Sequence, residues 1–253
     1  TVLNGKENQT VYFDTSSSYF NILEATNDKI ELTGYFAAKS LNSNVTVSSN
    51  NAKMYISDLK QKTLTVNGDV EVNKSIDIDG GTMTVNGMLR QTYGTITVNN
   101  GTLNVSGDYR IQTETINNIG EIEYQSVLAG LHMQKANDKV NIAGNFINRS
   151  CESSSDGHIL SAGTLTIGGD VYDWGYNSSY GRIQATGTHK TVLNGKEKQT
   201  VYFDTNSSCF NILEATNDQI ELTGYFAAKS LNSNVTVSSN NAKMYISDLK
   251  QKT

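Results

Sequence analysis

The sequence of 253 residues contains no proline, a single tryptophan and two cysteines. A chain of this length would ordinarily hold about a dozen prolines. Because proline cannot donate a backbone hydrogen bond, its absence favours strand ladders in which every N–H is used. No run of about 18 apolar residues is present, which argues against a membrane-spanning segment. No charged-then-apolar segment opens the chain, so we expect no signal peptide within it and regard it as an excerpt of a longer protein.

Concentrated charge and metal-binding motifs are also missing. The 20 basic and 25 acidic residues are interspersed and give a net charge of −5, which argues against a nucleic-acid partner. There is no Cys-x-x-Cys motif and no cluster of cysteine and histidine, so we expect no metal and no cofactor. A disulfide between Cys151 and Cys209 is not required, because a chain this long buries a sizeable core without one.

A long duplication is the most prominent feature that is present. Residues 1–63 return as residues 191–253, and residues 64–190 separate the two copies. Only four of the 63 positions differ, namely Asn8/Lys198, Ser16/Asn206, Tyr19/Cys209 and Lys29/Gln219. Arrays of this kind are built from units that meet only their neighbours. Near-identical copies are typical of spacers, stalks and multivalent binders, in which each added copy increases length or avidity.

A shorter period lies inside the 190-residue unit. One motif of threonine, alternating apolar residues, glycine and aspartate recurs with spacings of 19, 20, 37 and 25 residues. Its copies are Thr63–Asp69, Thr82–Met88, Thr102–Asp108, Lys139–Asn145 and Thr164–Asp170. We interpret the spacing of 37 as two turns of the shorter period. Companion strands are expected about half a period later, at Ser75–Ile78, Gly94–Val98 and Ile119–Tyr124.

The motif predicts strands with one buried face. Leu64 and Val66 point inward and Thr65 and Asn67 outward, while the glycine that follows each strand suits a corner with unusual backbone angles. Recurrence at a near-constant period favours an all-β chain folded as a parallel β-helix (β-solenoid) of about 19–20 residues per turn. A 190-residue unit would then be roughly 45–50 Å long.

The remaining segments are predicted as departures from this frame. We expect side loops at Gln125–Lys139, Asn148–Gly163 and Tyr172–Gly181, and a short helix within Ser126–Ala136. In the duplicated segment Gln9–Asp14 and Phe20–Glu24 indicate two strands, and the segment is either part of the solenoid or a separate junction module.

The Gly-Thr-Leu-x-Val-x-Gly-Asp motifs at Gly101–Asp108 and Gly163–Asp170 resemble the solenoid repeats of filamentous-haemagglutinin-type adhesins. The long duplicated block is similar to tandem arrays in large surface proteins of Gram-positive bacteria. This resemblance implies an extracellular location, at a bacterial cell surface or secreted, and a stalk or adhesive role. It carries over no catalytic residue.

One segment stands out as a candidate binding site. It holds the only tryptophan among several aromatic and polar residues that suit stacking on a sugar and hydrogen bonding to its hydroxyls. The candidate ligand-binding residues are Tyr172, Asp173, Trp174, Tyr176, Tyr180 and Arg182. The alternative is that Trp174 packs its loop back onto the rod.

Other sites are weaker hypotheses. Paired threonines such as Thr63 and Thr65 suit an ordered lattice such as ice, but equally a solvated strand face. Asp69, Asp108 and Asp170 follow equivalent glycines, and such clustered carboxylates are what a polysaccharide-active enzyme requires. Aspartate is, however, also common in turns. The three histidines are far apart in the sequence.

We therefore expect a non-enzymatic structural or adhesive segment, with a carbohydrate-binding module as the first alternative and a polysaccharide-active enzyme as the second. Glycans or a host or neighbouring cell surface are the expected partners, and end-to-end self-association of the repeats is a further expectation.

Overall fold

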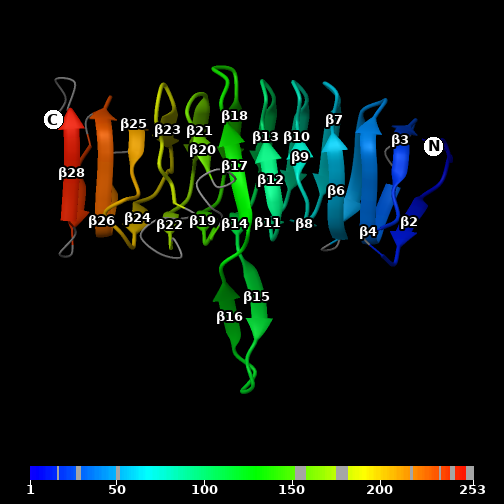
Figure 1. Ribbon diagram of the computed structural model, residues 1–253, viewed down its shortest axis with the longest axis horizontal. Coiled ribbons are helices and arrows are strands. Elements are labelled where there is room, and N and C mark those ends of the chain that lie inside the picture. The colour runs from blue at the N-terminus through cyan, green and yellow to red at the C-terminus, as the bar shows by residue number, and fades with distance from the viewer. Residues whose placement is uncertain are drawn as a thin grey trace.

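The computed structural model describes residues 1–15, 17–26, 30–49, 52–151, 158–174, 182–216, 219–233, 235–239 and 243–248. These residues contain no helix, and their strands form one 26-stranded sheet and one two-stranded hairpin. Figure 1 shows the strands side by side in a long row, with the chain advancing from one end to the other. The prediction of an all-β chain is confirmed, and the long, ring-like sheet is compatible with a solenoid.

Most strands of the long sheet fall into three ladders of parallel pairs. Ladder A holds β5 (Val45–Ser49), β7 (Thr63–Asn67), β10 (Thr82–Asn86), β13 (Thr102–Val105), β18 (Lys139–Ile142), β21 (Thr164–Ile167), β23 (Lys190–Leu193) and β25 (Phe210–Ala215). Ladder B holds β6 (Ala52–Asp58), β8 (Val70–Val72), β11 (Leu89–Gln91), β14 (Tyr109–Ile111), β19 (Phe146–Asn148), β22 (Val171–Asp173), β24 (Gln199–Phe203) and β26 (Ile220–Leu231). Ladder C runs from the end of β6 through β9 (Ile76–Asp77), β12 (Gly94–Thr97), β17 (Ala129–Met133) and β20 (Ile159–Leu160). We call one passage of the chain through A, B and C a rung.

The duplicated segment belongs to the same sheet. Its first copy forms β1 (Val2–Leu3), β2 (Gln9–Phe13), β3 (Phe20–Ala25) and β4 (Ile30–Leu41) and also contains β5 and β6, whose equivalents at the end of the second copy are β27 (Val237–Ser239) and β28 (Lys243–Asp248). β4 pairs with both β5 and β6, so the first copy leads directly into the rungs. β23 and β24 of the second copy pair in register with β21 and β22. The two predicted strands of the segment are confirmed as β2 and β3.

The two copies lie on different ladders. In the first copy Ile22 of β3 pairs with Ser40, and Ser40 pairs with Asp58, from which ladder C continues. In the second copy the equivalent residue, Ile212 of β25, pairs with Lys190 on ladder A. The same sequence is therefore displaced by one ladder around the long axis.

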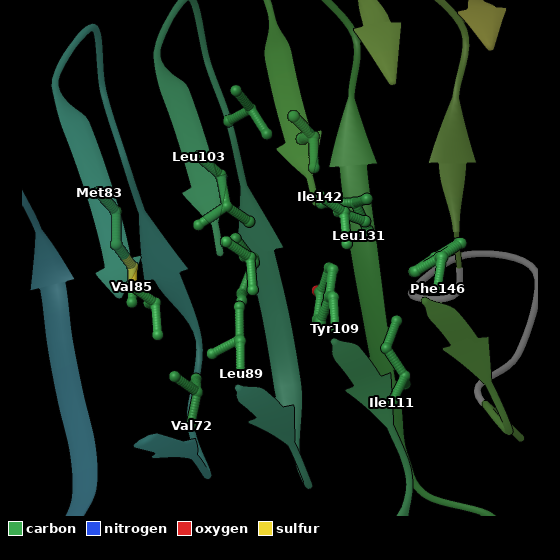
Figure 2. Close-up of a cluster of buried hydrophobic side chains, with 14 of the residues drawn as sticks. Val72, Met83, Val85, Leu89, Leu103, Tyr109, Ile111, Leu131, Ile142 and Phe146 are labelled. Atoms are coloured by element: carbon green, nitrogen blue, oxygen red, sulfur yellow. The ribbon is translucent and has the colours of Figure 1, made fainter. Parts of the chain in front are cut away.

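Alternation of side chains builds a continuous core. On ladder A, Leu64, Met83 and Leu103 stack inward in register and are fully buried, while the threonines beside them face outward. On ladder B, Tyr109 and Phe146 are also fully buried, with ring centroids 5.4 Å apart. Figure 2 shows Met83, Leu103, Tyr109 and Phe146 among the side chains that fill the space between the ladders. Each fully buried residue of this size contributes about 2–3 kcal/mol relative to an exposed one, so the stacking is driven mainly by the hydrophobic effect.

The glycines that follow five of the ladder A strands are required mainly by close packing. Of Gly68, Gly87, Gly107, Gly144 and Gly169, only Gly68 has a positive φ, of 115°. A Cβ placed on Gly144 would lie 2.7 Å from the carbonyl carbon of Gly107, and one on Gly169 would lie 2.6 Å from that of Gly144. The predicted reason was therefore wrong for four of these five positions, because successive backbones approach too closely for any side chain.

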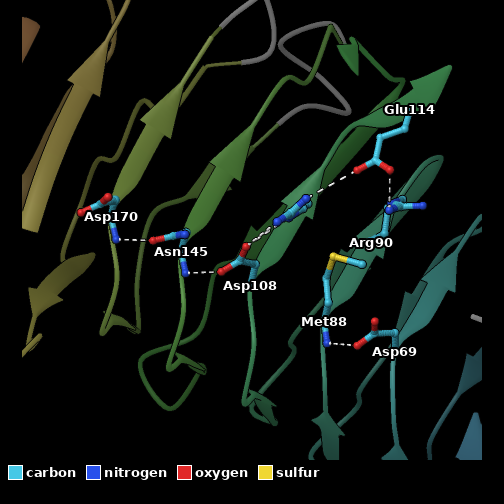
Figure 3. Close-up of polar contacts among 8 residues, drawn as sticks. Asp69, Met88, Arg90, Asp108, Glu114, Asn145 and Asp170 are labelled. Carbon is cyan, nitrogen blue, oxygen red and sulfur yellow. Dashed lines mark hydrogen bonds and ion pairs between the residues drawn. The ribbon is translucent and has the colours of Figure 1, made fainter. Parts of the chain in front are cut away.

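The aspartates that follow these glycines link one rung to the next. Asp108 Oδ1 accepts the backbone N–H of Asn145 at 2.8 Å, and Asn145 Oδ1 accepts that of Asp170 at 2.7 Å. Asp69 binds the N–H of Met88 in the same way, at 2.7 Å. Figure 3 shows this row, which is interrupted where Met88 offers no acceptor. Each carboxylate or amide thus satisfies a backbone donor at a corner where the ladders break.

The spacing of 37 residues is one rung with an insertion, which corrects the prediction of two turns. Thr102 pairs directly with Lys139. The additional residues form an antiparallel hairpin of β15 (Thr113–Ile116) and β16 (Ile122–Gln125), which projects from the row of strands in Figure 1. Ile119–Tyr124 is therefore part of the hairpin rather than a strand of a ladder.

The segment Gln125–Lys139 was also predicted wrongly. It was expected to hold a side loop and a short helix, but it contains β17, which pairs with β12 and β20. Leu131 and Met133 of β17 are fully buried, so the burial of apolar residues on ladder C decides its conformation. Parts of the other two predicted loops lie outside the described residues.

Candidate functional site

The predicted site begins at the end of β22. Tyr172 and Asp173 are the last two residues of this strand, and Trp174 follows directly. Tyr176 and Tyr180 lie outside the described residues. Of the six predicted residues, the structure therefore places Tyr172, Asp173, Trp174 and Arg182.

Two of these residues form an aromatic surface with a tyrosine of the next rung. The rings of Tyr172 and Trp174 are stacked, with centroids 5.1 Å apart and an angle of 4° between their planes. Tyr202 is paired with Tyr172 in register, and its ring centroid lies 5.7 Å from that of Trp174. The Tyr172 hydroxyl donates to Asp170 at 2.9 Å, and burial, followed by this hydrogen bond, raises its pKa to about 12. All three rings are only partly buried.

Arg149 completes this surface, and the sequence analysis did not identify it. Its guanidinium carbon lies 4.2 Å from the centroid of the Trp174 ring and 5.8 Å from that of Tyr124 at the base of the hairpin. Burial lowers the pKa of Arg149, but a guanidinium remains charged at neutral pH. The register of β19 and β22 pairs Asn148 with Asp173 and so brings Arg149 level with Trp174. We call Arg149, Tyr172, Trp174 and Tyr202 the aromatic–arginine surface.

The other two predicted residues lie in the interior. Asp173 is fully buried, and its carboxylate accepts hydrogen bonds from the Asn148 side-chain amide at 2.6 Å and from the Ile183 N–H at 3.1 Å. Burial raises the pKa of Asp173 to about 6. Arg182 is 4% exposed and donates to the hydroxyl of Thr205. These positions give Asp173 and Arg182 a role in supporting the rung beneath the aromatic–arginine surface.

A histidine extends this buried polar group. His158 Nε2 lies 2.9 Å from the side-chain oxygen of Asn148, which links it to Asp173 through one amide. Burial, followed by repulsion from His132, lowers the pKa of His158 to about 3, so the imidazole is neutral. Among the described residues no three His, Cys, Asp or Glu side chains form a group suited to a metal ion. Cys151 and Cys209 both lie among the described residues, and no disulfide joins them.

The paired threonines do not form one array. Thr63, Thr82 and Thr164 begin strands of ladder A, whereas Thr95 lies on ladder C. A groove of about 750 Å³ crosses the ends of four ladder A strands. Its lining includes Asn104, Asn141, Thr166, Asn194, Lys196 and Glu197. A groove of this volume is large enough for a ligand, and it is separate from the predicted residues.

Taken together, these features define an all-β protein with a long stacked sheet, a partly exposed aromatic–arginine surface and a groove over the ends of ladder A strands. Comparison with protein families, curated proteins and solved structures finds no match for the chain. None of the described segments is a helix long and apolar enough to cross a membrane.

Proposed function

We propose that the chain is a parallel β-helix that serves as a rod-like structural or adhesive segment of a surface or secreted protein. The single observation that carries this proposal is the in-register pairing of β23 and β24 with β21 and β22. Through this pairing, a repeat of the unit extends the same sheet. A duplication that extends one continuous core makes the molecule longer, and length is the property that a stalk requires.

The rung count sets the expected length. Rungs stack about 4.8 Å apart. The spacings of 37 and 25 residues are each a single rung, so a 190-residue unit contains about eight rungs and adds roughly 40 Å. This is less than a uniform turn of 19–20 residues predicts, because the hairpin takes residues out of the rod.

Small-angle X-ray scattering tests this proposal. The chain of 253 residues is compared with a chain lengthened by residues 64–253, which adds one unit in phase. A rod keeps its cross-section and gains about 40 Å in maximum dimension. A chain that folds into two separate compact bodies would show a larger cross-section or a flexible linker, and either result would contradict the proposal.

The aromatic–arginine surface favours a second function, carbohydrate binding with preference for an anionic sugar. Tyr172, Trp174 and Tyr202 supply partly exposed rings, and aromatic faces stack on apolar sugar faces. Arg149 supplies a positive charge suited to a carboxylate or sulfate. Extracellular location, and glycans or a cell surface as partners, form part of this proposal.

A glycan array tests the second function, with Trp174→Ala and Tyr202→Ala as the variants. Tyr12→Ala is the matched control, because Tyr12 has the same local sequence as Tyr202 but belongs to the first copy, which has no Trp174 beside it. Binding to acidic glycans should be lost in the first two variants and kept in the control. Binding that survives in Trp174→Ala would place the site elsewhere, and the groove over the ladder A strand ends would then be the next surface to test.

A further inference from the structure

The hairpin of β15 and β16 concentrates the exposed apolar surface of the middle of the chain. Between the two copies of the duplicated segment, the exposed large apolar side chains of the described residues all lie on the hairpin or at its base. They are Ile116 (76% exposed), Ile119 (78%), Ile122 (58%) and Tyr124 on the hairpin, and Tyr93 and Leu128, which the register of β12 with β17 sets side by side, at its base. Threonine would suit a solvated strand equally well, so this cluster indicates a surface that contacts a partner.

Arginines of three successive rungs hold the base of the hairpin in place. The carboxylate of Glu114 forms ion pairs with Arg90 at 2.9 Å and with Arg110 at 3.5 Å. The guanidinium carbon of Arg149 lies 5.8 Å from the centroid of the Tyr124 ring. The outer half of the hairpin projects from the row of strands (Figure 1). Because its base is anchored, the hairpin presents its surface to a partner at a small cost in conformational entropy.

Side-chain alternation gives β16 one apolar and one acidic face. Ile122 and Tyr124 lie on one face of this strand. Glu123 lies on the other face, and Glu121, which directly precedes the strand, continues that acidic face. The side-chain amide of Asn117 donates to both carboxylates, at 3.3 Å to Glu123 and 3.5 Å to Glu121, which confirms that they lie on the same side.

The backbone of β16 points outward at the two apolar positions. Among the described residues, β15 and β16 pair only with each other. The Asn117 N–H donates to the Glu121 carbonyl at 2.9 Å, and hydrogen-bonded and non-hydrogen-bonded pairs alternate along an antiparallel ladder. The N–H and C=O groups of Ile122 and Tyr124 therefore point away from β15, along the outer edge of the hairpin. An edge of this kind is a template for the addition of another strand.

The acidic residues determine which strand this edge accepts. Residues 111–134 contain no lysine or arginine, so no basic residue of the hairpin neutralises Glu121 and Glu123. Two copies of β16 paired antiparallel about Ile122 would place Glu121 of one chain opposite Glu123 of the other. Like charges directly opposite each other are destabilising, whereas a lysine or arginine at these positions is favourable. The charge therefore opposes a second copy of this chain and favours a basic partner.

We infer that the outer edge of β16 binds an extended segment of a partner protein in which apolar and basic residues alternate. Strand pairing sets the apolar residues of the partner beside Ile122 and Tyr124 and its basic residues beside Glu121 and Glu123. Because a slip of one residue would exchange the two faces, backbone pairing and charge select the same register. This protein partner is separate from the glycan proposed for the aromatic–arginine surface.

A short peptide in which valine and lysine alternate is the probe, and the fluorescence anisotropy of the labelled peptide reports its binding to the full chain. A peptide of the same composition with paired valines and paired lysines should bind about tenfold more weakly. Methylation of the valine nitrogens in one version and of the lysine nitrogens in another blocks opposite edges of the peptide, so binding should be lost in one version and kept in the other. Equal binding of all these peptides would overturn the inference, because charge alone would then explain it.

A charge exchange in the chain locates the site. Glu121→Lys combined with Glu123→Lys should weaken binding of the valine–lysine peptide by about tenfold and create binding of a peptide in which valine and glutamate alternate. Glu7→Lys combined with Asp14→Lys is the matched control, because it changes the net charge equally at exposed residues of the first copy, and it should leave both affinities unchanged. Ile122→Thr keeps a strand-forming residue and should weaken binding without changing which charge is selected. A charge-exchanged chain that does not bind the valine–glutamate peptide, or a control that loses binding equally, would overturn the inference. Dimers of the chain in light scattering that the peptide does not dissociate would overturn it as well, because the partner would then be a second copy.

Discussion

Alanine at Gly144 should destabilise the stacked sheet far more than its single methyl group suggests. The new Cβ would lie 2.6 Å from Asp108 Oδ1 and 2.7 Å from the backbone carbon and oxygen of Gly107. Carbon atoms normally approach to about 3.5–4.0 Å, so two rungs would have to separate by roughly 1 Å. The neighbouring atoms are mostly backbone, and a rotamer change in Asp108 cannot relieve the contact.

The magnitude follows from two effects. Overpacking in a well-packed core destabilises by about 1–3 kcal/mol. The separation also weakens the hydrogen bonds from Gly144 N–H to the Gly107 carbonyl, at 3.1 Å, and from Gly169 N–H to the Gly144 carbonyl, at 2.8 Å. Each is worth about 1 kcal/mol, so we expect a total loss of roughly 4 kcal/mol in the free energy of unfolding.

Urea unfolding followed by circular dichroism and by the fluorescence of Trp174 measures this loss. With a slope of about 2 kcal/mol per molar urea, the midpoint should fall by roughly 2 M. Gly120→Ala is the control, because Gly120 lies in the hairpin turn with φ of 86° and nothing within 4 Å of an added Cβ. It should strain the turn by about 1 kcal/mol and lower the midpoint by at most about 0.5 M. A Gly144→Ala chain within 1 kcal/mol of the unsubstituted protein would refute this reasoning.

Two further predictions concern polar side chains. Asp108→Ala leaves the Asn145 N–H without its carboxylate acceptor and removes the shorter of the two ion pairs of Arg110, which keeps Glu114 at 3.5 Å. It should lower the free energy of unfolding by about 2 kcal/mol, whereas Asp108→Asn keeps an acceptor and should lose less than half of that. Equal losses in urea unfolding would contradict the bond to Asn145. Burial lowers the pKa of His158 to about 3, so the unfolded chain binds a proton below about pH 6.5 that the folded chain does not, and stability falls as the pH falls. Burial raises the pKa of Asp173 to about 6, so the folded chain holds a proton that the unfolded chain releases above about pH 3.9, and stability falls as the pH rises. Between pH 4 and 6, the free energy of unfolding of Asp173→Asn should therefore rise with pH relative to that of the unsubstituted chain, by about 1.4 kcal/mol per pH unit. That of His158→Gln should fall by the same amount on the same comparison. If the stability of both variants followed the same pH profile as that of the unsubstituted chain, the two groups would not titrate as described.

The sequence predicted the strands of ladder A well, because period-2 alternation directly reports which side chains face a core. Leu64 and Val66 lie inside and Thr65 lies partly exposed, as expected. The sequence analysis failed where a rung changes length. The spacing of 37 residues is consistent with two short turns or with one turn and an insertion, and only the pairing of Thr102 with Lys139 distinguishes them.

The candidate site was predicted only in part for a related reason. Tyr172 and Trp174 were identified from composition, since aromatic residues gather there. Arg149 was missed because it comes 25 positions before Trp174 and meets it only through the register of β19 with β22. Asp173 was assigned to the surface, yet alternation along β22 already places it on the same side as buried Val171. The same alternation, continued to the end of the strand, predicts that the Asp173 side chain points inward.

The displacement of the duplicated segment by one ladder has a consequence for any partner. Ile22 and Ile212 occupy the same place in their sequences, but the first continues onto ladder C and the second lies on ladder A. In the proposed rod, identical surfaces on successive units therefore face different directions around the long axis. A flat partner can contact these surfaces only one at a time, whereas a fibre or a meshwork that surrounds the proposed rod can contact all of them.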